Sequence, residues 1–236
     1  MTDRPRGALR QEERSLAIGA SRYDWDGARL TVSLDEPCSL PSLGRVRGTV
    51  TIEPEAVTSV ELALSPDRAH VWRPFAPVSR IRVALDGQEP WEGKGYLDAN
   101  FGTRPLEADF SYWTWASYAA PDGALMLYDA DRRDGTRLAA AVHVARDGSA
   151  RMVDAPPKAP LPRSRWRVRR ETRADPGAAP RHVASMLDAP FYSRDEVETL
   201  IGERRMRGVH ESLDLDRYSS AVVKGMLAFR VPRARR

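Results

Sequence analysis

Residues 124–145 read ALMLYDADRRDGTRLAAAVHVA and contain two runs of strand-forming residues on either side of a turn. The first run covers residues 124–130 and the second covers residues 138–145. Between them stands Arg132-Arg133-Asp134-Gly135, and an Asp-Gly pair between two apolar runs is a strong short-range signal for a β-hairpin. This stretch therefore predicts antiparallel β-structure in the second half of the chain.

The first half of the chain shows the same kind of pattern. Residues 44–53 alternate through Val46, Gly48, Val50 and Ile52, and residues 23–34, 57–64 and 79–85 also alternate. Prolines and Asp-Gly pairs separate these runs and predict turns between them. Short strands at this spacing favour an all-β fold, either an antiparallel barrel or a sandwich.

One segment carries a helical signature instead. Ser193 followed by Glu196 fits a capping box, and Val197, Leu200 and Ile201 fall on one face of a helix. We therefore expect a short helix near the C-terminus, followed by a further alternating run over residues 209–218.

The composition excludes several classes of protein. The single cysteine, Cys38, cannot form an internal disulfide, which favours a reducing, cytoplasmic location. No apolar run approaches the ~20 residues of a membrane-spanning helix, and the N-terminus lacks the apolar core of a signal peptide. We expect no metal site and no nucleotide cofactor, because no phosphate-binding loop occurs and the four histidines stand far apart. These histidines are His70, His143, His182 and His210.

Positive charge is spread along the chain, which has a formal net charge of +4. The arginines are scattered among nearly as many carboxylates, as on an ordinary solvated surface, so nucleic acid is not an expected partner. Two clusters, residues 163–173 and 230–236, favour peripheral contact with an acidic membrane surface, such as the inner, photosynthetic membrane.

Two aromatic-rich segments could carry chemistry. Side chains alternate along a strand, so His70 and Trp72 share one face, and Tyr96 and Asp98 also share a face. Large aromatic surfaces follow at Phe101, Phe110, Trp113 and Trp115. The pattern by itself is compatible with two interpretations: core packing of aromatic residues, or an apolar ligand site with a perturbed carboxyl group.

Long motifs across the whole chain resemble one enzyme family. They are GYLDANFG at residues 95–102 with the aromatic run after it, HVWRPFAP at 70–77, RRETR at 169–173, MLDAPFYS at 186–193 and VHESLDLDR at 209–217. Together they are similar to the carotenoid 1,2-hydratases (hydroxyneurosporene synthases) of purple photosynthetic bacteria. Each motif is long and chemically mixed, so a chance match is improbable.

The resemblance implies a fold of two tandem lipocalin-like (calycin-type) antiparallel β-barrels, one at residues 1–118 and one at 119–236. Members of the family begin with a further N-terminal stretch, so the first barrel is expected to lack a strand. Barrels of about eight strands can hold one small apolar ligand, and the end of a carotenoid would fit such a space.

The resemblance also implies a reaction, the addition of water to the end group of an acyclic carotenoid such as neurosporene or lycopene. Such a reaction changes no oxidation state overall and is expected to need no cofactor. We expect Asp98 to act as the general acid, Tyr96 to orient it, Trp72 to stabilise a carbocation and His70 to accept a proton from water. The roles of Asp98 and His70 are interchangeable at this stage. The substrate-binding residues are expected to be Trp113, Trp115, Phe101 and Phe110.

Two other functions are compatible with the same scaffold. One is a non-catalytic, lipocalin-like carrier of a carotenoid or another apolar ligand, which needs the aromatic residues but no acid. The other is a cyclase or isomerase that handles a carbocation without adding water.

Overall fold

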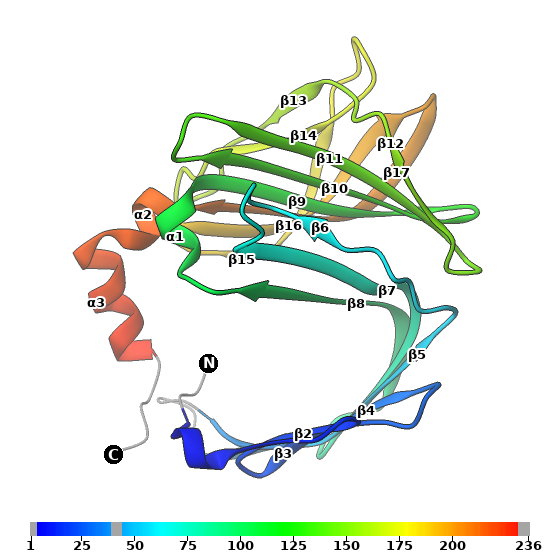
Figure 1. The fold of residues 1–236 in the computed structure, drawn as a ribbon, viewed down its shortest axis with the longest axis vertical. Helices are drawn as coiled ribbons and strands as arrows, with labels where there is room; N and C mark the ends of the chain where they lie inside the picture. Colours follow the sequence, from blue (N-terminus) through cyan, green and yellow to red (C-terminus); the bar gives the residue numbers. More distant parts are fainter. Residues whose placement is uncertain (1–3, 39–43, 231–236) are drawn as a thin grey trace. The chain divides into compact units, whose positions relative to one another are not determined.

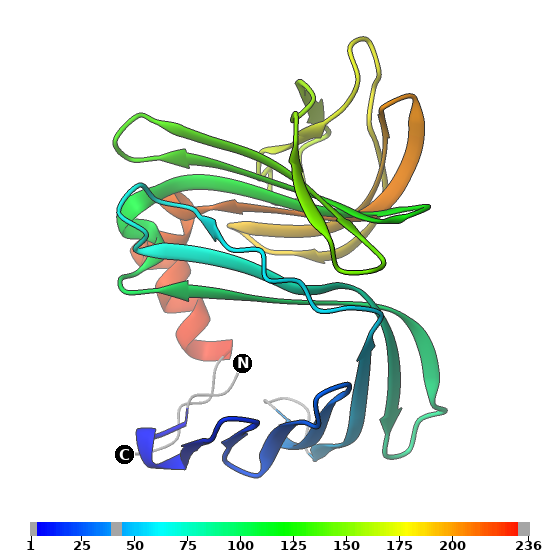
Figure 2. The same cartoon turned by 45° about the vertical axis from the view of Figure 1, so that its right-hand side comes forward.

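The computed structural model describes residues 4–38 and 44–230, and these residues are nearly all in antiparallel β-strands, as the sequence predicts. Figures 1 and 2 show the strands gathered into long, curved sheets. By contacts the chain divides into two compact units. Unit 1 comprises residues 1–56, 78–97 and 224–236, and unit 2 comprises residues 57–77 and 98–223. The division into barrels at 1–118 and 119–236, with a strand missing from the first, stays a prediction.

Unit 1 is built on a sheet whose strands follow chain order. Its elements are the 3-10 turn Arg6–Ala8, β1 (Leu9–Gln11), β2 (Ser15–Ile18), β3 (Ser21–Trp25), β4 (Leu30–Pro37), β5 (Arg45–Pro54), and the adjoining parts of β7 (His70–Leu85) and β8 (Trp91–Gly102). Each strand pairs antiparallel with the next one, and β5 pairs with β7.

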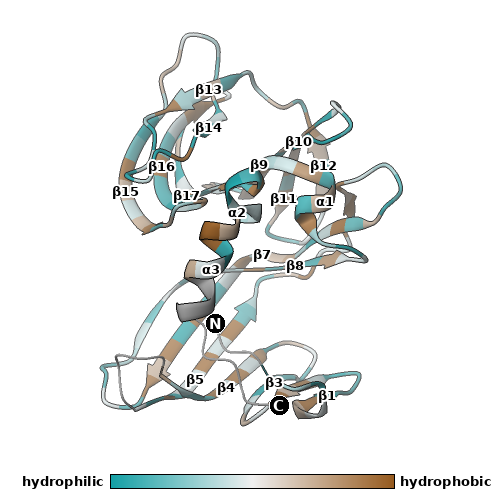
Figure 3. Ribbon diagram, turned by 90° about the vertical axis from the view of Figure 1, so that its left-hand side faces the viewer, coloured by the Kyte–Doolittle hydropathy of each residue, from teal (hydrophilic) through white to brown (hydrophobic). Residues whose placement is uncertain are grey.

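The register gives this sheet one apolar face. Leu16, Tyr23, Val32, Val50 and Val83 are paired in a row across the five strands, so their side chains point to the same side. Figure 3 shows the resulting alternation of hydrophobic and hydrophilic residues along β4 and β5. Val32 and Val83 in this row are buried, Leu16 and Val50 are partly buried, and Tyr23 is exposed.

Unit 2 holds a seven-stranded sheet in the order β12-β11-β10-β9-β17-β16-β15. Its strands are β9 (Phe110–Ala120), β10 (Gly123–Arg132), β11 (Arg137–Ala145), β12 (Ala150–Val153), β15 (Arg181–Asp188), β16 (Tyr192–Ile201) and β17 (Arg204–Asp214). Strands β13 (Lys158–Leu161) and β14 (Arg170–Arg173) form a separate pair, and β6 (Leu62–Ala63) pairs with β7. Figure 1 shows β9, β10 and β11 side by side.

The hairpin predicted from residues 124–145 is present as β10 and β11, with Asp131 opposite Arg137 next to the turn. One face of this sheet packs into an apolar cluster that contains Ala116, Tyr118, Leu125 and Leu127. The run predicted at residues 57–64 is mostly irregular, with only the two residues of β6 in a strand.

The helix predicted at Ser193–Ile201 is wrong, because these residues form most of β16. Every second side chain is buried, from Ser193 and Asp195 to Ile201, which is the period of a strand and not of a helix. Glu196 does not cap Ser193; its carboxylate pairs with Arg207 on β17 instead. Pairing with two neighbouring strands overrides the local capping signal.

Short helices do occur near the C-terminus, but later in the chain. The run predicted at residues 209–218 stays a strand only to Asp214, whose side chain accepts the backbone N–H of Arg217 and starts α2 (Leu215–Ser219). The other helices are α1 (Leu106–Asp109) and α3 (Ala221–Arg230). Among the described residues, no helix has the length and apolar character needed to span a bilayer. The side chains of the basic cluster at 230–236 lie outside the described residues.

Candidate active site

Trp72 and Asp98, one from each of the two aromatic-rich motifs, meet within unit 2. The indole Nε1 of Trp72, on β7, donates a hydrogen bond of 2.8 Å to Oδ2 of Asp98, on β8. Trp72 is fully buried, and Asp98 is half-buried. A carboxyl group is thereby held against the edge of a large aromatic ring in a part of the protein with little water.

Further aromatic rings stand next to this pair. The ring of Tyr128, on β10, lies 5.5 Å from the ring of Trp72 and 5.8 Å from that of Trp113. Trp115 is the register partner of Tyr128, so both side chains point to the same face of the sheet. We call the side chains of Trp72, Trp113, Trp115 and Tyr128 the aromatic wall. Burial raises the pKa of Tyr128 well above its usual range, and the negative charges of Asp98 and Glu211 add to this effect.

Glu211 is a second carboxyl group on the same face of the sheet. It lies on β17 opposite Trp115, and its side chain is only 17% exposed. Burial raises the pKa of Glu211, and the charge of Asp98 raises it further. The sequence analysis gave Glu211 no role, although it belongs to the VHESLDLDR motif at residues 209–217. Only strand pairing brings it to Trp115, which is 96 positions away in the chain (211 − 115).

His70 is buried and is held by a carboxylate. Its Nε2 lies 2.7 Å from Oδ2 of Asp109, and its ring meets Phe110 edge-on at 5.1 Å. Arg104 donates to the same oxygen of Asp109 at 2.7 Å, which is the main reason that the pKa of Asp109 is lowered. Because Asp109 is therefore ionised, Nε2 of His70 carries the hydrogen of this bond. The other ring nitrogen, Nδ1, lies against Gly102, where a Cβ would approach it to 3.0 Å.

The remaining predicted residues separate into different surroundings. Trp113 and Trp115 belong to the aromatic wall, whereas Phe110 is buried against His70. Phe101 is 50% exposed and lies outside these contacts. Tyr96 is half-buried on β8, two residues before Asp98. The structure thus brings Trp72, Asp98 and two of the predicted aromatic residues into one region.

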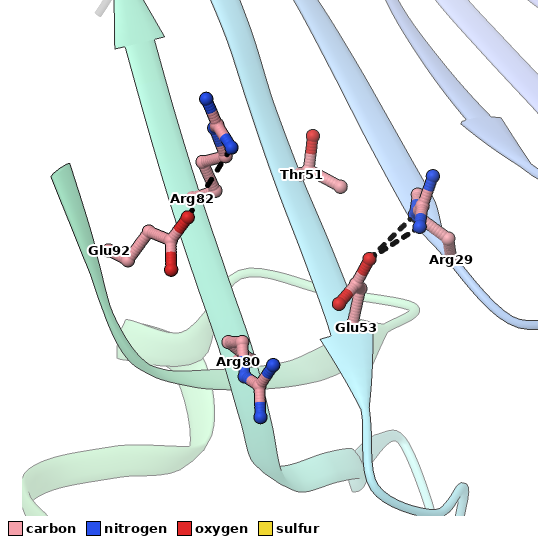
Figure 4. A pocket seen from close by; sticks show the side chains of 6 residues that line it. All are labelled: Arg29, Thr51, Glu53, Arg80, Arg82 and Glu92. Carbon is pink, nitrogen blue, oxygen red and sulfur yellow. Dashed lines mark hydrogen bonds and ion pairs between the residues drawn. The ribbon is translucent and has the colours of Figure 1, made fainter. Parts of the chain in front are cut away.

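A groove in unit 1 differs in character from the aromatic wall. Figure 4 shows the residues that line it, Arg29, Thr51, Glu53, Arg80, Arg82 and Glu92. Arg29 pairs with Glu53 at 2.6 Å and Arg82 with Glu92 at 3.4 Å. Its lining is polar and charged, so an apolar ligand would gain little from entering it. Among the described residues, no group of three or more His, Cys, Asp and Glu side chains is placed to hold a metal ion.

Comparisons with known proteins agree on one family. The family described as "Carotenoid hydratase CrtC" matches residues 1–236. The acyclic carotenoid 1,2-hydratase of Cereibacter sphaeroides is 53% identical over 233 residues, which cover 99% of this chain and 84% of that protein. The enzyme of the same name from Rhodobacter capsulatus is 49% identical over 234 residues, which cover 99% of this chain and 83% of that protein.

A third relative is longer. The acyclic carotenoid 1,2-hydratase of Thiocapsa roseopersicina is 43% identical over 99% of this chain but over 58% of its own length. Among solved structures, CghA with Sch210972 aligns with a TM-score of 0.47 and 15% identity, covering 90% of this chain and 72% of that chain.

Proposed function

Because this chain belongs to the carotenoid hydratase CrtC family, we propose that it adds water across the C1–C2 double bond at the end of an acyclic carotenoid. The products would be 1-hydroxy-1,2-dihydro carotenoids, made from neurosporene or lycopene in pathways of the spheroidene or spirilloxanthin type. The observation that supports this proposal best is the carboxyl group of Asp98, held by the indole N–H of Trp72 beside an aromatic wall.

The reaction begins with a proton. A trisubstituted alkene does not take up water without acid, and protonation at C2 leaves a tertiary cation at C1. We assign the proton donor to Asp98, whose Oδ2 accepts the hydrogen bond from Trp72. In the proposed reaction its carboxylic acid form gives a proton to C2 as the general acid.

The cation is the next requirement. The ring of Trp72 contacts Asp98 through its edge, and the ring of Tyr128 packs against that of Trp72, so aromatic rings surround the place where positive charge would develop. A cation over such a ring gains roughly 0.5–2 kcal/mol, and more when water is excluded. Trp113 and Trp115 would hold the adjoining polyene, because conjugated carbon chains pack well against flat aromatic surfaces.

A base must then take a proton from the attacking water. His70 is the base predicted from sequence, and Tyr96 is predicted to orient Asp98 or the water. Since Nε2 of His70 donates to Asp109, any such action of His70 would use Nδ1. Proton delivery and proton removal balance, so the proposed reaction needs no cofactor. Peripheral contact with the membrane in which carotenoids dissolve is part of the same proposal.

Isotope labelling tests the proposal against its rivals. The purified full chain would be incubated in deuterated water with neurosporene or lycopene in detergent, and the products analysed by mass spectrometry. A hydratase gives an alcohol with deuterium at C2 and oxygen from water. A carrier returns unlabelled substrate, and a cyclase or isomerase gives a product without added oxygen. Either of the last two results would overturn the proposal.

A further inference from the structure

Glu211 belongs to a motif to which the proposed mechanism gives no task. It lies on β17, where its register partners are Trp115 on β9 and Arg194 on β16. Trp115 is in turn paired with Tyr128, whose ring contacts that of Trp72. Glu211 therefore stands on the face of the sheet that carries the aromatic wall, and its side chain points to the same side as the rings.

The charges around Glu211 connect it to Asp98. Burial is the main cause that raises the pKa of Glu211, and the charge of Asp98 adds to it. Burial likewise raises the pKa of Tyr128, with smaller contributions from Asp98 and Glu211. From β16, Arg194 approaches Glu211 to 3.5 Å and the hydroxyl of Tyr192 donates a hydrogen bond to its carboxylate. Arg194 and Tyr192 favour the ionised form of Glu211, while burial and Asp98 favour the protonated form. The net effect is a raised pKa for Glu211. When Asp98 carries the proton, its repelling charge is absent, and Arg194 and Tyr192 then favour an ionised Glu211.

Asp98 and Glu211 stand beside the same aromatic wall, Asp98 through the indole N–H of Trp72 and Glu211 opposite Trp115, and the charge of one affects the pKa of the other. Two carboxyl groups that repel each other hold one proton between them over a range of pH, because that proton relieves the repulsion between two negative charges. The second proton is taken up only at lower pH, because no repulsion is left for it to relieve. Acid-catalysed hydration needs this arrangement, with one carboxylic acid to give a proton and one carboxylate to receive one.

We propose that Glu211 is a second catalytic carboxyl group, which takes the proton of the attacking water while Asp98 gives its proton to the alkene. This inference rests on the proposed hydration. The π pair of the C1–C2 double bond takes the proton of Asp98, so that the carboxyl O–H bond breaks and the C2–H bond forms. A lone pair of water then forms the C1–O bond with the cation, and an O–H bond of that water breaks as its proton passes to Glu211. The pair holds one proton before and after turnover, and exchange between the two groups restores the starting state. His70, whose Nε2 is engaged by Asp109, is the rival base.

The first measurement needs no activity. Carbon-13 NMR of glutamate carboxyl groups would follow the titration of Glu211 in the full chain and in Asp98→Asn, with the signal assigned by its loss in Glu211→Gln. We expect Glu211 to titrate at lower pH in Asp98→Asn, because the repelling charge is gone. Glu196, partly exposed and paired with Arg207, gives a reference signal that should titrate at the same pH in both proteins. An unchanged titration of Glu211 in Asp98→Asn would overturn the coupling.

The second measurement is the hydration rate across pH. We expect kcat of Glu211→Gln to fall by about 10²–10⁴-fold, the usual contribution of general acid–base catalysis, with one limb of the pH profile lost. The matched control, Glu196→Gln, should keep the wild-type rate and both limbs. Glu211→Asp retains a carboxyl group and should keep both limbs at a reduced rate, which makes the test independent of whether Glu211→Gln folds.

The outcomes separate the two proposals. Glu211 would lose the base role if Glu211→Gln kept the wild-type kcat and both limbs of the pH profile. The same conclusion would follow if only His70→Asn lost a limb of the pH profile. The wild-type chain could form no hydrated carotenoid while the titration of Glu211 still shifts in Asp98→Asn. In that case the proposed hydration is wrong, and the electrostatic interaction between Asp98 and Glu211 is retained.

Discussion

The hydrogen bond of 2.8 Å from Nε1 of Trp72 to Oδ2 of Asp98 joins the paired strands β7 and β8, which are connected by the short turn at residues 86–90. It fixes the orientation of the carboxyl group relative to a fully buried ring. Neither residue can turn away without leaving a buried polar atom unpaired, which costs about 1–3 kcal/mol. The geometry of the proposed proton donor therefore depends on Trp72.

Replacing Trp72 by Phe tests the contribution of the hydrogen bond independently of the contribution of the aromatic ring. The variant keeps an aromatic face but loses the N–H that orients Asp98, and hydrogen bonds to charged groups contribute about 1.5–3 kcal/mol. We expect kcat for hydration to fall by about 10–100-fold, measured with neurosporene under saturating conditions. Trp91→Phe, at a ring that is 53% exposed, is the control and should keep the wild-type rate. Wild-type activity in Trp72→Phe would show that this bond does not position Asp98 for catalysis.

Replacing Asp98 by Asn should abolish hydration. The amide accepts the indole hydrogen bond and has nearly the same shape, so the fold and carotenoid binding should be retained, but it cannot deliver a proton at neutral pH. Product analysis and the absorbance change on carotenoid binding would measure the two effects separately. Asp86→Asn, on an exposed turn, should behave as wild type. Substantial turnover in Asp98→Asn would transfer the acid role to another residue.

Breaking the buried ion pair between Arg173 and Asp129 should destabilise unit 2. The guanidinium donates to both carboxylate oxygens, at 2.5 and 2.9 Å, and both side chains are less than 10% exposed. Asp129→Asn leaves the positive charge of Arg173 buried without its partner, which costs about 3–5 kcal/mol in the free energy of unfolding. Urea unfolding followed by circular dichroism would measure the loss.

The double variant Asp129→Leu with Arg173→Met tests the reason for that loss. Removing both charges should recover much of the stability, since apolar residues of similar size often replace a buried pair without cost. Asp24→Asn, which breaks an exposed pair with Arg22, should cause no measurable change. Equal losses in the single and double variants would mean that the charge is not the cause.

His210 should make the stability depend on pH. It is fully buried, and burial lowers its pKa from 6.5 to about 4. At pH values between these two pKa values, His210 binds a proton in the unfolded chain but not in the folded chain. The free energy of unfolding therefore rises with pH over this range. One pKa unit corresponds to about 1.4 kcal/mol, so His210 should cost the fold about 3 kcal/mol on going from pH 7 to pH 4.

The measurement compares urea unfolding at both pH values for the wild type and for His210→Gln. Glutamine can still donate to the carbonyl oxygen of Glu171, which Nε2 of His210 contacts at 2.8 Å, but it does not titrate. The variant should lose less stability than the wild type between pH 7 and pH 4. The same loss in both proteins would show that His210 is not the group responsible.

Much of the candidate site can be predicted from short-range patterns. The i, i+2 spacing of His70 and Trp72, and of Tyr96 and Asp98, follows from the alternation of side chains along a strand. The structure brings Trp72 and Asp98 together through a hydrogen bond. It separates their neighbours, however, because Phe101 is exposed and Phe110 packs against His70. Alternation tells which residues share a face of one strand, and it does not tell what covers that face.

The sequence by itself determined the antiparallel hairpin at residues 124–145, because strand-forming residues and an Asp-Gly turn act between near neighbours. It also determined membership of the hydratase family, which the long motifs carry. Only the tertiary structure decided that the segment from Ser193 to Ile201 is a strand, since its capping signal lost to pairing on both sides.

The tertiary structure alone also placed Glu211 opposite Trp115 and beside the aromatic wall that contains Trp72. The physical reason is the same in both cases. Backbone preferences and turns depend on a few adjacent residues, whereas strand register depends on hydrogen bonds and burial between segments far apart in the chain. A carboxyl group whose neighbours come from four different strands has no short-range signature.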